Sequence, residues 1–161
     1  MRSMLWIVVF ALALTVGTQT VSAEDASMTP VMISLMTPVQ APTSEWDVKG
    51  LRIDLLYGEC HNLHGLDVGL VNHTAGKELG LEVGVVNYVE GGFTGLQVGG
   101  VNIGKRVKAL QVGVYNEADD VSGIQIGLIN HTRIMRGCQI GLINVIEKND
   151  LAFLPIFNCF F

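Results

Sequence analysis

Apolar and polar positions alternate with a period of two over most of this chain. From Gly50 onward the unit Gly-Leu/Ile-x-Val/Ile-Gly-x-Val/Ile-Asn recurs, as in GLDVGLVN and GIQIGLIN. Positions 2, 4 and 6 of the unit are aliphatic, position 3 is polar and position 5 is glycine. This alternation is typical of a half-buried β-strand. It predicts that the aliphatic positions face a core, while the glutamine and glycine positions form an outer surface.

The units follow one another without interruption to the end of the chain. They start at Gly50, Gly65, Gly80, Gly95, Ala109, Gly123, Gly137 and Leu151. The first and last units are degenerate, as terminal repeats often are. The pattern predicts an all-β fold, a small β-solenoid of about eight coils of 14–15 residues. In that fold Val112 and Ile126 are expected to be buried neighbours on adjacent coils.

Position 8 is asparagine in seven of the eight units. Stacked asparagines can bond one another from layer to layer, which predicts a buried ladder at a corner of the coil. Its members are Asn72, Asn87, Asn102, Asn116, Asn130, Asn144 and Asn158. The residues after position 8 lead the chain back to the start of the next coil. They contain one apolar residue per unit, which is expected to anchor them to the core: Leu63, Leu79, Phe93, Val107, Val121 and Met135.

An eight-stranded antiparallel β-barrel is the alternative fold, because an export signal and a terminal Phe161 are usual in outer-membrane barrels. Position 11 favours the solenoid. Its charges alternate in sign over five successive units, and stacked coils would place them side by side as a charge ladder. The members are Glu90, Lys105, Asp119, Arg133 and Glu147.

The segments before the repeats predict export and a cap. Residues 1–23 have a basic start, an apolar run and a small-x-small ending at Ala23, which predicts a cleaved signal peptide. Residues 24–49 are rich in proline, threonine and methionine and predict a linker without regular structure. Its apolar residues are expected to cover the first edge, with Trp46 against Leu51 and Ile53. Residues 50–161 form the repeat domain.

The last unit and the cysteines complete the pattern. Pro155 marks an edge strand, and four phenylalanines are expected to seal the open core: Phe153, Phe157, Phe160 and Phe161. Cys138 occupies a core column, where it replaces a leucine, and is expected to be a small buried hydrophobe. A Cys138–Cys159 bridge joins neighbouring coils, but their unit positions indicate different sides. Cys60 lies too far from Cys159 to bridge it.

Charge excludes one class of partner. The chain has a net charge of −5, and an acidic chain is a poor candidate for binding nucleic acid. The basic residues near Lys105 are interpreted as paired with acidic residues of the neighbouring coil.

Units of the form G-[LI]-Q-[IV]-G-[LV]-[IV]-N, which cover Gly65 to Asn158, resemble the short surface-repeat proteins of spirochaetes and other Gram-negative bacteria. The resemblance implies a location in the cell envelope, at the outer surface or outside the cell. It implies no assigned catalytic activity and supplies no active-site residues.

One cluster carries metal-type ligands: Glu59, Cys60, His61 and His64. It resembles half of a zinc site, and no second half is apparent in the sequence. No catalytic grouping can be argued, so the chain is not expected to be an enzyme or to hold a cofactor. The leading interpretation is an exported structural or binding module that contacts another envelope protein or a surface ligand through a flat Gln/Gly/Val face. A small outer-membrane pore is the alternative, a metal-dependent activity is a distant third, and membrane association stays open.

Overall fold

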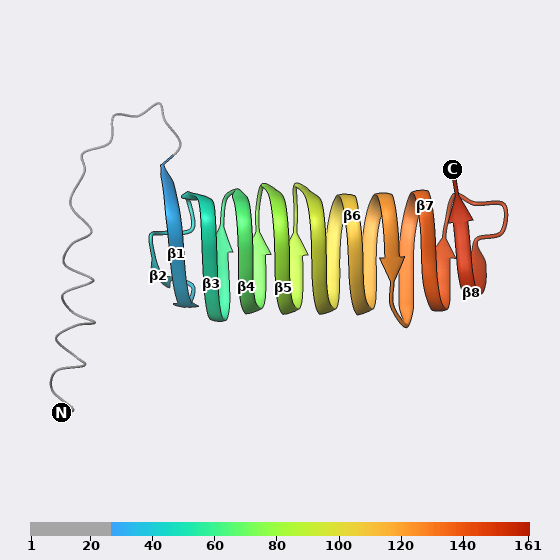
Figure 1. Ribbon diagram of the computed structural model, residues 1–161, viewed down its shortest axis with the longest axis horizontal. Coiled ribbons are helices and arrows are strands. Elements are labelled where there is room, and N and C mark those ends of the chain that lie inside the picture. The colour runs from blue at the N-terminus through green and yellow to red at the C-terminus, as the bar shows by residue number, and fades with distance from the viewer. Residues whose placement is uncertain (1–26) are drawn as a thin grey trace, which may run out of the picture.

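The structure is a computed structural model that describes residues 27–161. The predicted signal peptide, residues 1–23, lies outside the described residues. The chain winds into a rod of stacked β coils (Figure 1), and it contains strands but no helix within the described part. None of the described residues therefore forms a helix that could cross a membrane. The predicted β-solenoid is confirmed.

Eight strands form a single sheet in the order β2-β1-β3-β4-β5-β6-β7-β8. Their bounds are β1 Met28–Met36, β2 Val39–Ala41, β3 Asp47–Cys60, β4 Leu63–Thr74, β5 Lys77–Val89, β6 Gly92–Ile126, β7 Ile129–Ile146 and β8 Phe153–Phe160. From β1 to β7 neighbouring coils pair in parallel, and equivalent repeat positions stand side by side, as Leu66 does with Leu81. Eight antiparallel strands are therefore not formed.

The strand faces are inverted relative to the sequence prediction. Gln97, Gln111 and Gln125, at position 3, are buried, whereas Ile126 at position 4 is 38% exposed and Val112 is only partly buried. The prediction that Val112 and Ile126 form the core is therefore wrong. The interior instead holds polar side chains. Most of the buried asparagines and glutamines bond the same residue type on the next coil, which makes the burial of these polar groups tolerable.

Two amide ladders run along the interior. Each of Asn72, Asn87, Asn102, Asn116 and Asn130 donates through Nδ2 to Oδ1 of the asparagine on the next coil, at 2.7–2.9 Å. The position 3 glutamines form a second ladder in which each Nε2 donates to the preceding coil at 2.6–2.8 Å. The predicted asparagine ladder is confirmed from Asn72 to Asn144, whereas Asn158 in β8 donates to the backbone carbonyl oxygen of Asn144 instead. The glutamine ladder is a buried feature that the sequence prediction placed outside.

Apolar side chains fill the rest of the interior. The predicted anchors Leu63, Phe93, Val107, Val121 and Met135 are buried. The last four pack with Val89, Ala118 and Ile146, whereas Leu63 packs with Met32, Val48 and Cys60. Leu79 is an exception, because the register pairs Leu63 with Glu78, which takes the anchor position while Leu79 is 49% exposed.

Glycine is required at two positions of the coil. At position 1 the glycines have φ between 137° and 151°, and a Cβ at Gly80 would overlap the carbonyl oxygen of Gly65. At position 5 the space of the missing side chain is filled by the asparagine ladder, since a Cβ at Gly84 would lie 2.5 Å from Asn87 Oδ1. The position 5 glycines thus face inward and make room for the ladder.

The N-terminal segment caps the stack with regular structure. β1 pairs in parallel with β3, and β2 folds back on β1. The expectation of an irregular linker is therefore wrong, although the expectation that it covers the first edge is correct. Trp46 packs against the cluster of Met32, Val48, Cys60 and Leu63, and not against Ile53, which points outward and is 37% exposed.

The C-terminal cap works through the backbone and a disulfide. β8 runs antiparallel to β7, which sets Cys159 directly opposite Cys138, and the two cysteines are bonded. Two sequence predictions are therefore corrected: Cys138 is only partly buried and lies outside the core, and the reversal of the chain brings both cysteines to one side. The four phenylalanines do not seal the core, because Phe153, Phe157, Phe160 and Phe161 are 38–91% exposed.

Candidate functional site

The largest candidate surface is a sheet face made of repeat positions 2, 4 and 6, which we call the aliphatic face. In β1 the register adds Val31 and Ile33 beside Leu51 and Ile53, and in β8 it adds Phe157 beside Ile140. The position 4 column therefore runs unbroken through nine rungs: Ile33, Ile53, Val68, Val83, Val98, Val112, Ile126, Ile140 and Phe157.

The aliphatic face is exposed along its length and carries no charged residue in its three columns. Position 6 is the most prominent, with Val85 56%, Val114 55%, Leu128 52% and Leu142 66% exposed. Single exposed aliphatic residues are ordinary in soluble proteins, but a large contiguous apolar patch marks an interaction surface. The Gln/Gly/Val face predicted from the sequence is thus corrected to a face of leucine, valine and isoleucine, because glutamine points inward.

An apolar hollow interrupts the aliphatic face near its C-terminal end. It has a volume of about 330 Å³ and is lined by Ile126, Leu128, Ile140, Leu142 and Ile156, with Gly127 and Gly141 between them. Ile156 is 72% exposed and has a φ of 70°. A β-branched residue is strained in that left-handed conformation, and such strain clusters at functional sites.

A protrusion stands at the opposite end of the same face. β3 has one more residue than β4 between Asp54 and Tyr57, a β-bulge that the register shift records. Consecutive Leu55 and Leu56 are 57% and 49% exposed there. The bulge therefore makes two leucine side chains project from the aliphatic face near its N-terminal end, whereas the hollow lies near its C-terminal end.

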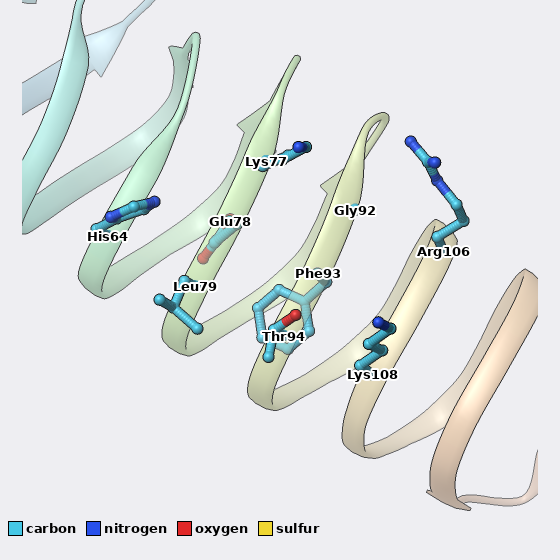
Figure 2. Close-up of a pocket in the computed structure, with 9 residues that line it drawn as sticks. All are labelled: His64, Lys77, Glu78, Leu79, Gly92, Phe93, Thr94, Arg106 and Lys108. Atoms are coloured by element: carbon cyan, nitrogen blue, oxygen red, sulfur yellow. The ribbon is translucent and has the colours of Figure 1, made fainter.

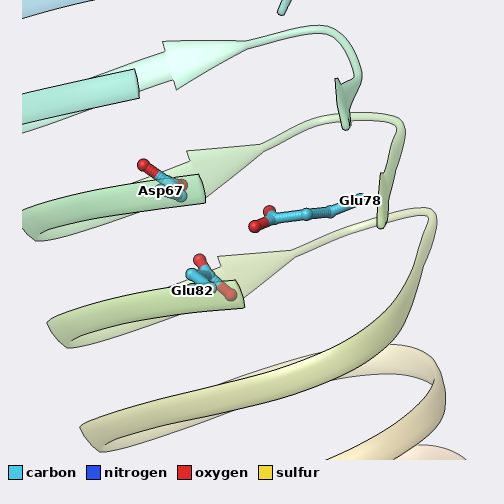
Figure 3. A group of neighbouring side chains, drawn as sticks. All are labelled: Asp67, Glu78 and Glu82. Atoms are coloured by element: carbon cyan, nitrogen blue, oxygen red, sulfur yellow. The ribbon is translucent and has the colours of Figure 1, made fainter. Parts of the chain in front are cut away.

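A second candidate site lies inside the first coils, where charged residues replace the glutamine ladder. Arg52, Asp67 and Glu82 occupy successive position 3 sites, next to Gln97. Arg52 donates to Asp67 through Nε and Nη2, and to the carbonyl oxygen of His73 at 2.8 Å. Figure 3 shows the carboxylates of Asp67, Glu78 and Glu82 directed toward one another.

Burial makes these acids hard to ionise. It raises the pKa of Asp54 to about 7 and that of Glu78 to about 8, although the positive charge of Arg52 opposes both shifts. The pKa of Glu82 is also raised, by burial and by the neighbouring Glu78. Asp54 Oδ2 lies 3.0 Å from Arg52 Nε, yet both Asp54 oxygens lack a partner with hydrogen-bond geometry among the described residues.

The predicted metal ligands do not converge. Cys60 faces the interior, accepts a hydrogen bond from Arg52 Nη1 at 2.9 Å, and has a pKa raised by burial to about 12. Glu59 is only partly buried, and His61 and His64 are exposed. Over residues 27–161 the only group of three or more metal-type side chains whose ligand atoms lie within 4.8 Å of one another is Asp67, Glu78 and Glu82. Arg52 already binds the carboxylate of Asp67.

Of the predicted charge ladder, one ion pair between neighbouring members forms among the described residues. Lys105 Nζ lies 3.9 Å from Glu90 Oε2, whereas within the described chain Asp119 and Arg133 form no ion pair. The carboxylates are bound instead by histidine: Glu90 contacts His73 at 3.1 Å and Glu147 contacts His131 at 3.0 Å. Stacking sets these residues near one another, but long exposed side chains need not pair.

A groove with basic residues follows the turn side of the coils. It has a volume of about 400 Å³, and Figure 2 shows Lys77, Arg106 and Lys108 along it, with Phe93 at its base. These three cations form no ion pair with any described residue. The interpretation that all the basic residues pair with the neighbouring coil is thus wrong for Arg106 and Lys108.

Comparison with family models, with curated proteins and with solved structures finds no match for this chain. Its function must therefore be argued from the rod itself. The interior is filled by ladders and charged residues, and the aliphatic face is its largest apolar surface.

Proposed function

We propose that this chain is an exported, non-catalytic structural and binding module of the cell envelope, and that the aliphatic face is its working surface. The single observation that carries the proposal is this charge-free face, which extends from β1 to β8 and leaves leucine, valine and isoleucine side chains in water. Contact with an apolar protein surface removes these side chains from water, and that transfer is favourable in proportion to the area buried.

A rigid rod suits such a role. The ladders order the backbone before any partner arrives, so little conformational entropy is lost when the face binds. The predicted signal peptide and the resemblance to envelope repeat proteins support export.

The test compares three forms of the chain produced in a Gram-negative host. The face variant carries Val85→Glu, Val114→Glu and Leu128→Glu, and the control variant carries Leu79→Glu and Leu151→Glu. Leu79 and Leu151 are 49% and 63% exposed but lie outside the aliphatic face. We expect the wild type and the control variant to sediment with washed envelopes and to be released by carbonate, and the face variant to stay soluble. Equal sedimentation of all three would refute the proposal.

A further inference from the structure

We propose that the partner of the aliphatic face is a second copy of this chain, packed face to face and antiparallel, with the leucine bulge of each copy in the hollow of the other. This inference rests on the proposed function and names its partner. It combines the size of the face, the spacing of its rungs, and the positions of the bulge and the hollow.

The area of the face matches what a stable dimer needs. Nine rungs about 4.8 Å apart, each five residues wide at about 3.3 Å per residue, cover roughly 700 Å². The largest apolar patch of a typical monomer is about 300–600 Å², whereas a specific interface buries about 800 Å² on each partner. The aliphatic face is thus large for a monomer surface and close to the size of one half of an interface.

The spacing of the rungs favours an identical partner. Equivalent side chains repeat once per coil, so the face consists of ridges and grooves with the pitch of the parallel sheet. A second copy presents the same pitch, so the rungs of the two copies stay aligned along the whole length of the face. Two sheets that pack in this way lie about 10 Å apart, as in a β-sandwich.

The bulge and the hollow select the antiparallel orientation. A two-fold axis parallel to the strands at the middle rung, which runs from Leu96 to Gly100, sets the second rung of one copy over the eighth rung of the other. The second rung carries Leu55 and Leu56, and the eighth carries Ile140 and Leu142 beside the hollow. A two-fold axis along the rod would superpose equal rungs and leave both hollows unfilled.

The interface is isologous, because each copy contributes the same residues to it. The strained Ile156 stands at the rim of the hollow and contacts the inserted leucines. The dimer thereby buries a side chain that is 72% exposed in the single chain.

The first experiment measures the mass of the disulfide-bonded chain by light scattering during size-exclusion chromatography. We expect the wild type and the control variant to have the mass of a dimer, and the face variant half that mass. All three should share one circular dichroism spectrum, because the substituted side chains point outward. A wild type that stays monomeric at roughly 100 µM overturns the second-copy proposal, and so does a face variant that stays dimeric.

The second experiment tests the orientation by oxidative cross-linking. We expect the double variant Leu55→Cys/Leu142→Cys to form a covalent dimer on a non-reducing gel, and each single variant to remain uncoupled. Cross-linking of Leu142→Cys alone overturns the antiparallel arrangement, because equal rungs then lie together. Failure of the double variant to cross-link overturns it as well.

Failure of this inference can be separated from failure of the proposed function. A monomeric wild type whose envelope retention is still lost in the face variant leaves the proposed function standing with another partner. Zwitterionic and anionic phospholipid vesicles then test whether that partner is a lipid surface. A monomeric wild type with retention equal to that of the face variant rejects both proposals.

Discussion

At the scale of single residues, the first coils differ chemically from the rest of the rod. Four buried acids, Asp54, Asp67, Glu78 and Glu82, surround the single buried cation Arg52. One positive charge cannot neutralise four negative charges in an interior from which water is excluded. The acids therefore hold protons at a pH where exposed acids are ionised, which is the physical meaning of their raised pKa values.

This proton uptake makes stability depend on pH. The pKa of Asp54 is about 7 and that of Glu78 about 8 in the folded chain, against about 4 when unfolded. Between these values the folded state binds more protons than the unfolded state, so the free energy of unfolding falls as pH rises from about 4 to about 8. We expect the midpoint of thermal unfolding of the wild type to be higher at pH 5 than at pH 8.

Glu82→Gln should weaken this dependence. The substitution restores the residue of the later coils and provides an amide that can donate to Asp67, so we expect a gain of about 1–3 kcal/mol at pH 8. The gain should shrink as the pH falls, because the raised pKa of Glu82 favours its uncharged form. Asp119→Asn, at an exposed position, is the control and should leave the pH profile unchanged. Parallel profiles for wild type and Glu82→Gln would show that Glu82 does not contribute.

At the scale of the strand, the amide ladders determine which face of each strand points to the interior. Gln97, Gln111 and Gln125 stack in one interior column and the asparagines in another, and each amide bonds the next coil. An amide that has both its partners inside the protein loses little on burial, whereas an unpaired one costs a full desolvation penalty. The inward side of the coil is thus the side on which identical polar residues stack.

Asn116→Ala should show how strongly a ladder is coupled. The change removes the bonds from Asn116 to Asn130 and to the carbonyl of Ile126, and it takes one of the two acceptors from the Asn102 amide. We expect a loss of about 1–3 kcal/mol in the free energy of unfolding, measured by urea denaturation. Asp119→Ala, three residues away and exposed outside the aliphatic face, is the control and should change stability by less than about 0.5 kcal/mol. Equal losses for both variants would contradict the ladder.

At the scale of the whole molecule, the rod is limited by its two ends. A parallel stack leaves unpaired backbone groups on its first and last coils, and such edges invite further pairing. β1 and β2 cover the first edge, and β8 reverses direction to cover part of the last. The Cys138–Cys159 bond then fixes β8 in place across a separation of 21 residues.

Loss of this bond should loosen the C-terminal cap. Cross-linking residues 21 apart stabilises a fold by about 3 kcal/mol through the entropy of the unfolded chain. We expect Cys138→Ser/Cys159→Ser to lower the midpoint of urea denaturation and to expose Gly137–Val145 to hydrogen exchange. Protection at the N-terminal cap should stay as in the wild type, and a uniform loss along the rod would contradict a local role.

The candidate face could be foreseen only in part. Its columns are visible in the sequence as Leu66, Val68 and Leu70 and the equivalent residues of the other units. The strand period of two places these positions on one side of the sheet. The sequence prediction placed this face inside the protein and was wrong, because aliphatic residues that alternate along a strand usually face the core. Glycine at position 5 was the available signal, since a glycine in six of the eight units indicates close packing on that side.

The sequence by itself determined the repeat, the coil length, the stacking register and the asparagine ladder, because all four depend on residues that recur at a fixed spacing. Only the tertiary structure decided which strand face is buried and that Glu78, not Leu79, occupies the interior anchor position. It also decided which acids contact Arg52 and that the antiparallel β8 places Cys159 opposite Cys138. These features depend on contacts between coils and on changes of chain direction. A period of two gives two faces but does not say which of them is enclosed when the chain closes around its own polar ladders.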